Sequence, residues 1–119
     1  MKRVLIVEDE PDIAELIRQL LEQAGFSASY AVDPRKGLKR LGECDLVILD
    51  LTMPHMSGME FLEAARKKNA DVPVILVSAH VLDREALEGI IAKYPGVSFV
   101  SKLDLHKDLV NAVNARLRK

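Results

Sequence analysis

Five polar side chains that could take part in chemistry each stand at or just after the end of a short apolar run. They are Glu8, Asp9, Asp50, Ser78 and Lys102. In open parallel sheets, ligands bind outside the carboxyl ends of the strands, where the strand order reverses. We therefore expect these side chains to meet in one site.

Three of the five are carboxylates, which has an electrostatic consequence. If the first and third strands are neighbours, about 4.8 Å apart, then Glu8, Asp9 and Asp50 share one small pocket. Like charges this close raise one another's pKa or require a cation, and a hard divalent ion with oxygen ligands is the common solution. The sequence therefore predicts a Mg²⁺ site in which the ion retains several waters.

Lys102 and Ser78 complete a set of groups suited to phosphoryl transfer, which depends on charge neutralisation more than on covalent chemistry. Asp50 would be the nucleophile, because aspartyl phosphates are an established class of covalent intermediate. Lys102 would neutralise phosphoryl oxygens as a compact point charge, and Ser78 would hydrogen-bond one of them.

The elements that position these residues alternate between β-rich runs and segments of helical period. This alternation predicts five βα units that form a parallel sheet with helices on both faces. The expected strands are residues 3–8, 26–31, 45–50, 72–79 and 97–101. Five helices are expected, over residues 11–25, 34–42, 57–65, 83–94 and 104–119. Pro11 and Pro34 mark the first two helix starts, and Ser57 with Glu60 has the spacing of a capping box at the third. In the fourth helix, we expect Leu87, Ile90 and Ile91 to face inward.

Length and charge narrow the classes of function. A chain of 119 residues fits one domain, which we expect over residues 1–119, and a net charge of -1 argues against direct binding of nucleic acid. The apolar stretches are shorter than the roughly 20 residues of a membrane span, and a strand pattern follows Met1 at once. Cys44 is the single cysteine and fits a reducing compartment. We therefore expect a cytoplasmic chain without membrane association, in which the Cys44 side chain is buried or half-buried.

Four motifs together resemble the CheY-like receiver family over essentially the whole chain. They are VEDEP at Val7 to Pro11, DLTMPHMSGMEFL at Asp50 to Leu62, VSA at Val77 to Ala79, and SFVSK at Ser98 to Lys102. The resemblance implies an α/β, flavodoxin-like, doubly wound fold with five parallel strands in the order 2-1-3-4-5 and five helices. It also implies a response regulator domain of two-component signalling that acts as a phosphorylation switch.

The resemblance also implies roles for the metal site. Asp50 would accept the phosphoryl group, Asp9 and Asp50 would ligate Mg²⁺ directly together with the backbone carbonyl of Thr52, and Glu8 would act through a metal-bound water. His80, with Thr52, would modulate the lifetime of the phosphate.

Further implications concern the signal and the partners. Ser78 would move toward the phosphate, Phe99 would turn inward, and the surface of the fourth helix, fifth strand and fifth helix would change. The phosphodonor would be a sensor histidine kinase or histidine phosphotransfer protein that reads the first helix near Asp12, Glu15 and Gln19. The sequence does not identify the cognate kinase or the downstream effector, and homodimerisation through the fourth and fifth helices is left open.

Two positions depart from the family pattern. Leu103 follows Lys102 where a proline, commonly with a cis bond, is usual, and a trans bond is expected because a cis bond before other residues costs about 2.5–4 kcal/mol. Glu8 replaces the commoner aspartate and adds one methylene.

Three other readings remain open. An aspartyl-phosphate phosphohydrolase would need a second acid two residues after the nucleophile, but Thr52 occupies that position. A flavodoxin-like cofactor carrier would need a phosphate-binding first turn, but the acidic residues 8–12 (EDEPD) would repel a phosphate. A degenerate receiver would serve only for interaction, although this chain keeps all five pocket groups. As a receiver, the chain would not be an enzyme beyond self-directed phosphotransfer and autodephosphorylation.

Overall fold

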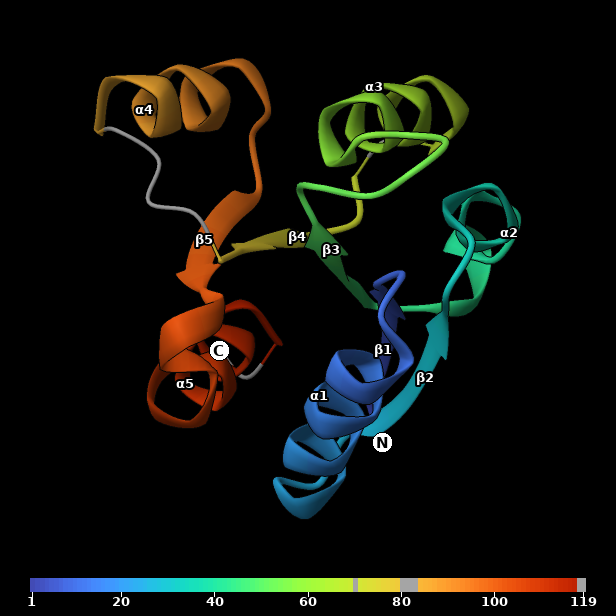
Figure 1. Ribbon diagram of the computed structural model, residues 1–119, viewed down its shortest axis with the longest axis vertical. Coiled ribbons are helices and arrows are strands. Elements are labelled where there is room, and N and C mark those ends of the chain that lie inside the picture. Colours follow the sequence, from blue (N-terminus) through green and yellow to red (C-terminus); the bar gives the residue numbers. More distant parts are fainter. Residues whose placement is uncertain (70, 80–83, 118–119) are drawn as a thin grey trace.

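The computed structural model describes residues 1–69, 71–79 and 84–117. Its five strands form one parallel sheet in the order β2-β1-β3-β4-β5 (Figure 1). The strands are β1 (Arg3–Val7), β2 (Ser27–Ala31), β3 (Leu46–Asp50), β4 (Val74–Ser78) and β5 (Val97–Ser101). The predicted α/β fold and strand order are confirmed.

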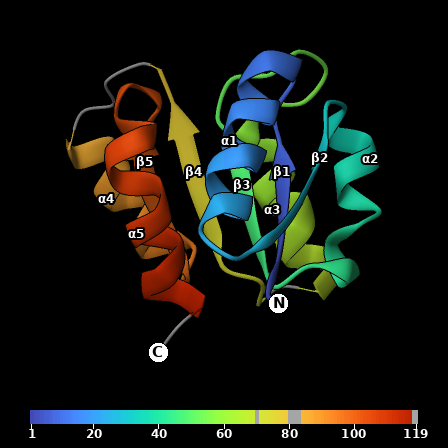
Figure 2. The same cartoon turned by 90° about the horizontal axis from the view of Figure 1, so that it is seen from below.

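Five α-helices and two short 3-10 turns connect the strands. They are α1 (Pro11–Gln23), α2 (Pro34–Leu38), α3 (Gly58–Asn69), α4 (Arg84–Lys93) and α5 (Leu105–Leu117), with η1 (Leu41–Glu43) and η2 (Lys102–Asp104). Helices α1 and α5 cover one face of the sheet, and α2, α3 and α4 cover the other (Figures 1 and 2).

Apolar side chains from both faces of the sheet form two separate cores. One contains Ile6, Ile48 and Val77 with residues of α1 and α5, and the other contains Leu49 and Leu76 with residues of α3. All five residues of β3 and of β4 are buried, because helices cover both sides of these central strands. The continuous apolar runs of β3 and β4 in the sequence are therefore explained by helices that cover both faces of these strands.

Local sequence signals set several helix ends as predicted. Pro11 is the first residue of α1, and Gly25 follows its end with a φ of 93°, a left-handed conformation that glycine adopts without strain. At the start of α3, the Ser57 N–H donates to Glu60 Oε1 (3.0 Å) and the Glu60 N–H donates to Ser57 Oγ (3.1 Å). The predicted capping box is therefore confirmed.

The second helix was predicted too long. It ends at Leu38, and the chain continues into the 3-10 turn η1 instead of reaching Gly42 as one helix. Glycine weakens a helix interior, and Gly37 lies so close to β1 that a Cβ there would be 3.0 Å from Val7 Cγ2. Leu41, the first residue of η1, is nevertheless buried.

The predicted inward position of Ile91 is wrong. Leu87 and Ile90 of α4 are half-buried, but Ile91 is 46% exposed. Adjacent helix residues point about 100° apart, and Ile90 already takes the position that faces the core.

The last helix was predicted to begin one residue too early, because Asp104 belongs to η2 and α5 begins at Leu105. Residues 118 and 119 of that predicted helix, and residue 83 of the fourth, lie outside the described residues. Cys44 is half-buried, as expected. Among the helices within the described ranges, none is long and apolar enough to cross a membrane.

Candidate functional site

The register of the sheet places the predicted residues at one edge. Val7 pairs with Leu49, so Glu8 and Asp50, each one residue further along neighbouring strands, lie next to each other. On the other side, Ser78 pairs with Ser101, and Lys102 is the next residue after that pair. Polar side chains at or just after the ends of β1, β3, β4 and β5 therefore lie at one edge, because parallel strands end together.

The three predicted carboxylates form one cluster. Glu8, Asp9 and Asp50 each offer a carboxylate oxygen, and these oxygens all lie within 4.8 Å of one another. Glu8 is fully buried, Asp50 is 2% exposed, and Asp9 is half-buried. Such a set of closely spaced hard oxygen donors fits Mg²⁺, and the half-buried Asp9 leaves one side of the cluster accessible to water.

Lys102 is the cation that partly balances this cluster. Its Nζ lies 2.6 Å from Glu8 Oε1 and 3.3 Å from Asp50 Oδ2, and its side chain is 13% exposed. The approach to Glu8 Oε1 is an ion pair and not a well-directed hydrogen bond, since this buried oxygen has no hydrogen-bond partner of good geometry among the described residues. Lys102 therefore contacts both carboxylates at the ends of β1 and β3.

These surroundings shift two ionisation equilibria. Burial raises the pKa of Glu8 from 4.5 to about 7; the contact with Lys102 opposes the shift, and the charge of Asp50 adds to it. Burial works against the charge of Lys102, but the contacts with Glu8 and Asp50 together outweigh it and raise the pKa of the ammonium group. Lys102 therefore keeps its charge at neutral pH, whereas the pKa of Glu8 is well above that of a free carboxyl group.

The loop after β3 holds Asp50 from the other side. Asp50 Oδ1 accepts a hydrogen bond from the Thr52 N–H (3.1 Å), and the Gly58 N–H donates to the Leu51 carbonyl (3.0 Å). A Cβ on Gly58 would lie 2.6 Å from the backbone oxygen of Asp50, so only glycine fits there without displacement. This close approach was missed in the sequence, where the glycine after the capping serine was its only signal.

Three further predicted residues lie near the cluster in different ways. Ser78 is buried at the end of β4, and Phe99 of β5 is half-buried. Phe99 pairs with Leu76, two residues before Ser78, so Ser78 and Phe99 lie on the same face of the sheet, the face covered by α3 and α4. The side chain of Thr52 is exposed.

The two remaining sequence predictions near the site are Leu103 and His80. The Lys102–Leu103 bond is trans, as expected, because no cis bond occurs within the described ranges, and Leu103 is 77% exposed. His80 lies outside the described residues, so its predicted influence on the phosphate stays a prediction.

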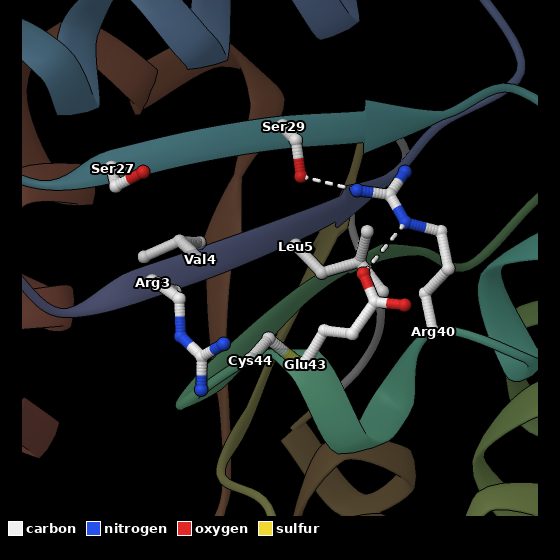
Figure 3. A pocket seen from close by; sticks show the side chains of 8 residues that line it. All are labelled: Arg3, Val4, Leu5, Ser27, Ser29, Arg40, Glu43 and Cys44. Atoms are coloured by element: carbon white, nitrogen blue, oxygen red, sulfur yellow. Dashed lines mark hydrogen bonds and ion pairs between the residues drawn. The ribbon is translucent and has the colours of Figure 1, made fainter.

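A hollow of about 200 Å³ lies elsewhere, toward the amino-terminal half of β1 and β2 (Figure 3). Arg40 reaches across it to Ser29 Oγ (2.6 Å) and also lies 3.6 Å from Glu43 Oε1. Its guanidinium group is therefore engaged within the chain. No residue that lines this hollow belongs to the predicted site.

Comparison with known families assigns the chain to a class. The family described as response regulator receiver domain matches residues 4–114. The chain therefore belongs to the response regulator receiver family of two-component systems, and its fold is that of the CheY-like receivers. Members of this family bind Mg²⁺ in an acidic pocket, to which the cluster of Glu8, Asp9 and Asp50 corresponds. The family is not a classical enzyme family.

Individual relatives agree with this assignment. The chain is 34% identical over 118 residues to the transcriptional regulatory protein YrkP of Bacillus subtilis, a match that covers 98% of this chain and 50% of the relative. It is 30% identical over 122 residues to the phosphate regulon transcriptional regulatory protein PhoB of Escherichia coli, covering 99% and 52%. The chain thus spans about half the length of these curated relatives.

Solved structures show the same fold. The response regulator TrrA of Thermotoga maritima, solved in complex with Mg²⁺ and BeF, superposes with a TM-score of 0.81 at 34% identity, covering 98% of this chain and 100% of that one. The chemotaxis protein CheY4 of Vibrio cholerae gives a TM-score of 0.85 at 25% identity, covering 98% and 99%.

Proposed function

We propose that this chain is a phosphorylation switch in which Asp50 accepts a phosphoryl group from a histidine kinase or a histidine phosphotransfer protein. The observation that carries the proposal is the cluster at the strand ends, where the Asp50 carboxylate lies among Glu8, Asp9 and Lys102. The Mg²⁺–BeF complex of the similar protein TrrA supports the same chemistry.

Asp9 and Asp50 would hold Mg²⁺ directly, together with the backbone carbonyl of Thr52, and Glu8 would contact it through water. When bound, Mg²⁺ supplies charge neutralisation for the phosphoryl oxygens. Lys102 is charged and close enough to Asp50 to pair with a phosphoryl oxygen, and Ser78 would hydrogen-bond another.

In the transfer step, a carboxylate oxygen of Asp50 attacks the phosphorus of the donor phosphohistidine. The new P–O bond forms as the P–N bond breaks, and the electron pair of that bond returns to the imidazole nitrogen. The Thr52 N–H holds the other side of the Asp50 carboxylate during attack. The product is an acyl phosphate. In its hydrolysis, water attacks the phosphorus, the P–O bond to Asp50 breaks, and inorganic phosphate leaves as the carboxylate is restored.

The phosphate would be sensed through Ser78 and Phe99, which lie on one face of the sheet. Movement of Ser78 toward the phosphate would make room for Phe99, and the surface formed by α4, β5 and α5 would then change for an effector or a second copy of this chain. A two-state change of this kind needs a coupling of about 1–3 kcal/mol. His80 would modulate the phosphate lifetime, and residues 1–119 would form a single receiver domain.

Incubation with acetyl phosphate and Mg²⁺, followed by intact-mass analysis, tests the proposal. We expect a single adduct of about 80 Da that depends on Mg²⁺ and is absent from Asp50→Asn. An Asp50→Asn protein that gains the same adduct would refute the assignment of the acceptor. Multiple turnover of an external phosphate ester would favour the phosphohydrolase, and a folded protein that never gains the adduct would be a degenerate receiver.

A further inference from the structure

Helix α2 covers only part of the edge strand β2. Ser27 and Ser29 of β2 share one face of the sheet with Leu5, which pairs with Ser29 and belongs to the core on the side of α2 and α3. Both serines are exposed, whereas Ala31 at the other end of β2 is buried. The short α2 therefore leaves the amino-terminal half of β2 open on this face.

The hollow of about 200 Å³ lies at this open part of the sheet (Figure 3). Its polar lining consists of two guanidinium groups, one carboxylate, two hydroxyl groups and one thiol, from Arg3, Arg40, Glu43, Ser27, Ser29 and Cys44. Pockets for drug-sized ligands begin at roughly 300 Å³, and one water occupies about 30 Å³. The hollow therefore has room for a small polar molecule in place of about six waters.

Arg40 is held in place at the hollow by other groups of the chain. It donates hydrogen bonds to Ser29 Oγ (2.6 Å) and to the Tyr30 carbonyl (3.3 Å). These bonds use two of the five N–H groups of a guanidinium, so donors remain for a ligand. Arg40 Nε lies 3.6 Å from Glu43 Oε1, but Glu43 is exposed, and exposed ion pairs are weak. A ligand anion can therefore replace Glu43 beside Arg40.

Arg3 supplies a second cation on the other side of the hollow (Figure 3). Its Nε lies 4.0 Å from Asp45 Oδ2, too far for a hydrogen bond, and its side chain is 57% exposed. Asp45 Oδ2 instead accepts a hydrogen bond from the backbone N–H of Arg3 (2.8 Å), so the guanidinium group can turn toward a ligand. Burial raises the pKa of the Cys44 thiol, which therefore stays neutral and does not repel an anion.

We propose that the hollow is a binding site for a small dianion, a dicarboxylate or a phosphate, whose oxygens bridge Arg3 and Arg40. The acids beside these arginines, Glu43 and Asp45, approach the guanidinium nitrogens only to 3.6 and 4.0 Å. A carboxylate or phosphate makes bidentate bonds to guanidinium of about 2.7–2.9 Å, which are stronger. The exposed Ser27 pairs with Arg3 and offers its hydroxyl group as a further donor.

This site is separate from the proposed function. Arg3 is the first residue of β1, whereas the acid cluster lies beyond the last residue of that strand. The hollow and the phosphoryl acceptor therefore lie at opposite ends of the sheet, and a dianion can occupy the hollow without Mg²⁺.

The test is an NMR titration of the isotope-labelled chain with succinate and, separately, with inorganic phosphate. Mg²⁺ is left out, and sodium chloride at equal ionic strength is the reference, because salt screens exposed charges. We expect saturable shifts of the amide signals of Ser27, Ser29 and Cys44 with at least one of the two anions. A response to succinate alone assigns the site to dicarboxylates, and a response to phosphate alone assigns it to phosphate.

Three substitutions of arginine by glutamine show whether the two lining arginines hold the anion. Arg3→Gln should weaken binding about tenfold or more, because a charged hydrogen-bond donor is lost from an exposed side chain. Arg40→Gln should have an effect at least as large, with circular dichroism as the check on folding. Arg35→Gln is the control, because Arg35 of α2 pairs with Asp33 and does not line the hollow. Its affinity should change by about twofold or less.

Three results would overturn the inference. They are the absence of a saturable shift with either anion, equal shifts with sodium chloride, and equal affinities of Arg3→Gln and Arg35→Gln. The titration uses neither Mg²⁺ nor a phosphodonor, so its failure leaves the phosphorylation of Asp50 untouched.

Discussion

Replacement of Gly58 by alanine tests how closely the start of α3 packs on the end of β3. Gly58 is the first residue of α3, and its N–H donates to the Leu51 carbonyl at 3.0 Å. An added Cβ would lie 2.6 Å from the Asp50 backbone oxygen and 2.7 Å from the Leu51 Cα. Both neighbours are backbone atoms, so neither can move away by a change of rotamer.

Two opposing effects decide the sign of the change. Alanine in place of a helical glycine stabilises by about 0.5–1 kcal/mol through lower unfolded-state entropy. Overpacking against fixed neighbours costs typically about 1–3 kcal/mol, and contacts below 3 Å to backbone place Gly58 toward the upper end. We expect a net loss of about 1–2 kcal/mol for Gly58→Ala, or about 4–8 °C in Tm at about 4 °C per kcal/mol for this chain length.

Thermal and urea unfolding followed by circular dichroism measure this difference. Gly89→Ala is the matched control, because Gly89 lies inside α4 and an added Cβ there meets nothing within 4 Å. Gly89→Ala should therefore raise stability by up to about 1 kcal/mol. A Gly58→Ala protein that is as stable as wild type, or that gains as much as Gly89→Ala, would refute the argument from close approach.

Two further predictions concern Glu8 and Arg66. Because burial raises the pKa of Glu8 to about 7, stability of the metal-free chain should fall as the pH rises from about 4.5 through 7, and Mg²⁺ affinity should rise over the upper part of this range. Denaturant titrations and calorimetry at several pH values would show this, and Glu8→Gln should flatten both trends. Arg66 donates hydrogen bonds to the Val72 carbonyl (2.9 Å) and the Pro95 carbonyl (3.0 Å). Arg66→Met should therefore lower the free energy of unfolding, measured in urea, by about 1–2 kcal/mol. An equal loss of stability in Lys67→Met, at an exposed site, would contradict this explanation.

Sequence periodicity was sufficient for the sheet and most helix boundaries, because these depend on neighbours within a few residues. Strand β3 reads as a continuous apolar run because helices cover both of its faces, and Pro11 and the Ser57/Glu60 pair mark helix starts through local bonding. The errors arose where distant packing competes with local preference. Gly37 approaches β1 and α2 ends at Leu38, and the adjacent residues Ile90 and Ile91 could not both face the core.

The proximity of Glu8, Asp9, Asp50 and Lys102 could also be predicted from the sequence, since residues at the ends of parallel strands share one edge of the sheet. Only the tertiary structure decided which partner each charge takes. Lys102 lies nearer to Glu8 than to Asp50, a difference between 2.6 and 3.3 Å that depends on side-chain reach and on the register of β1, β3 and β5. The pKa of Glu8 likewise depends on burial by residues far away in the sequence, because desolvation is a property of the packed fold.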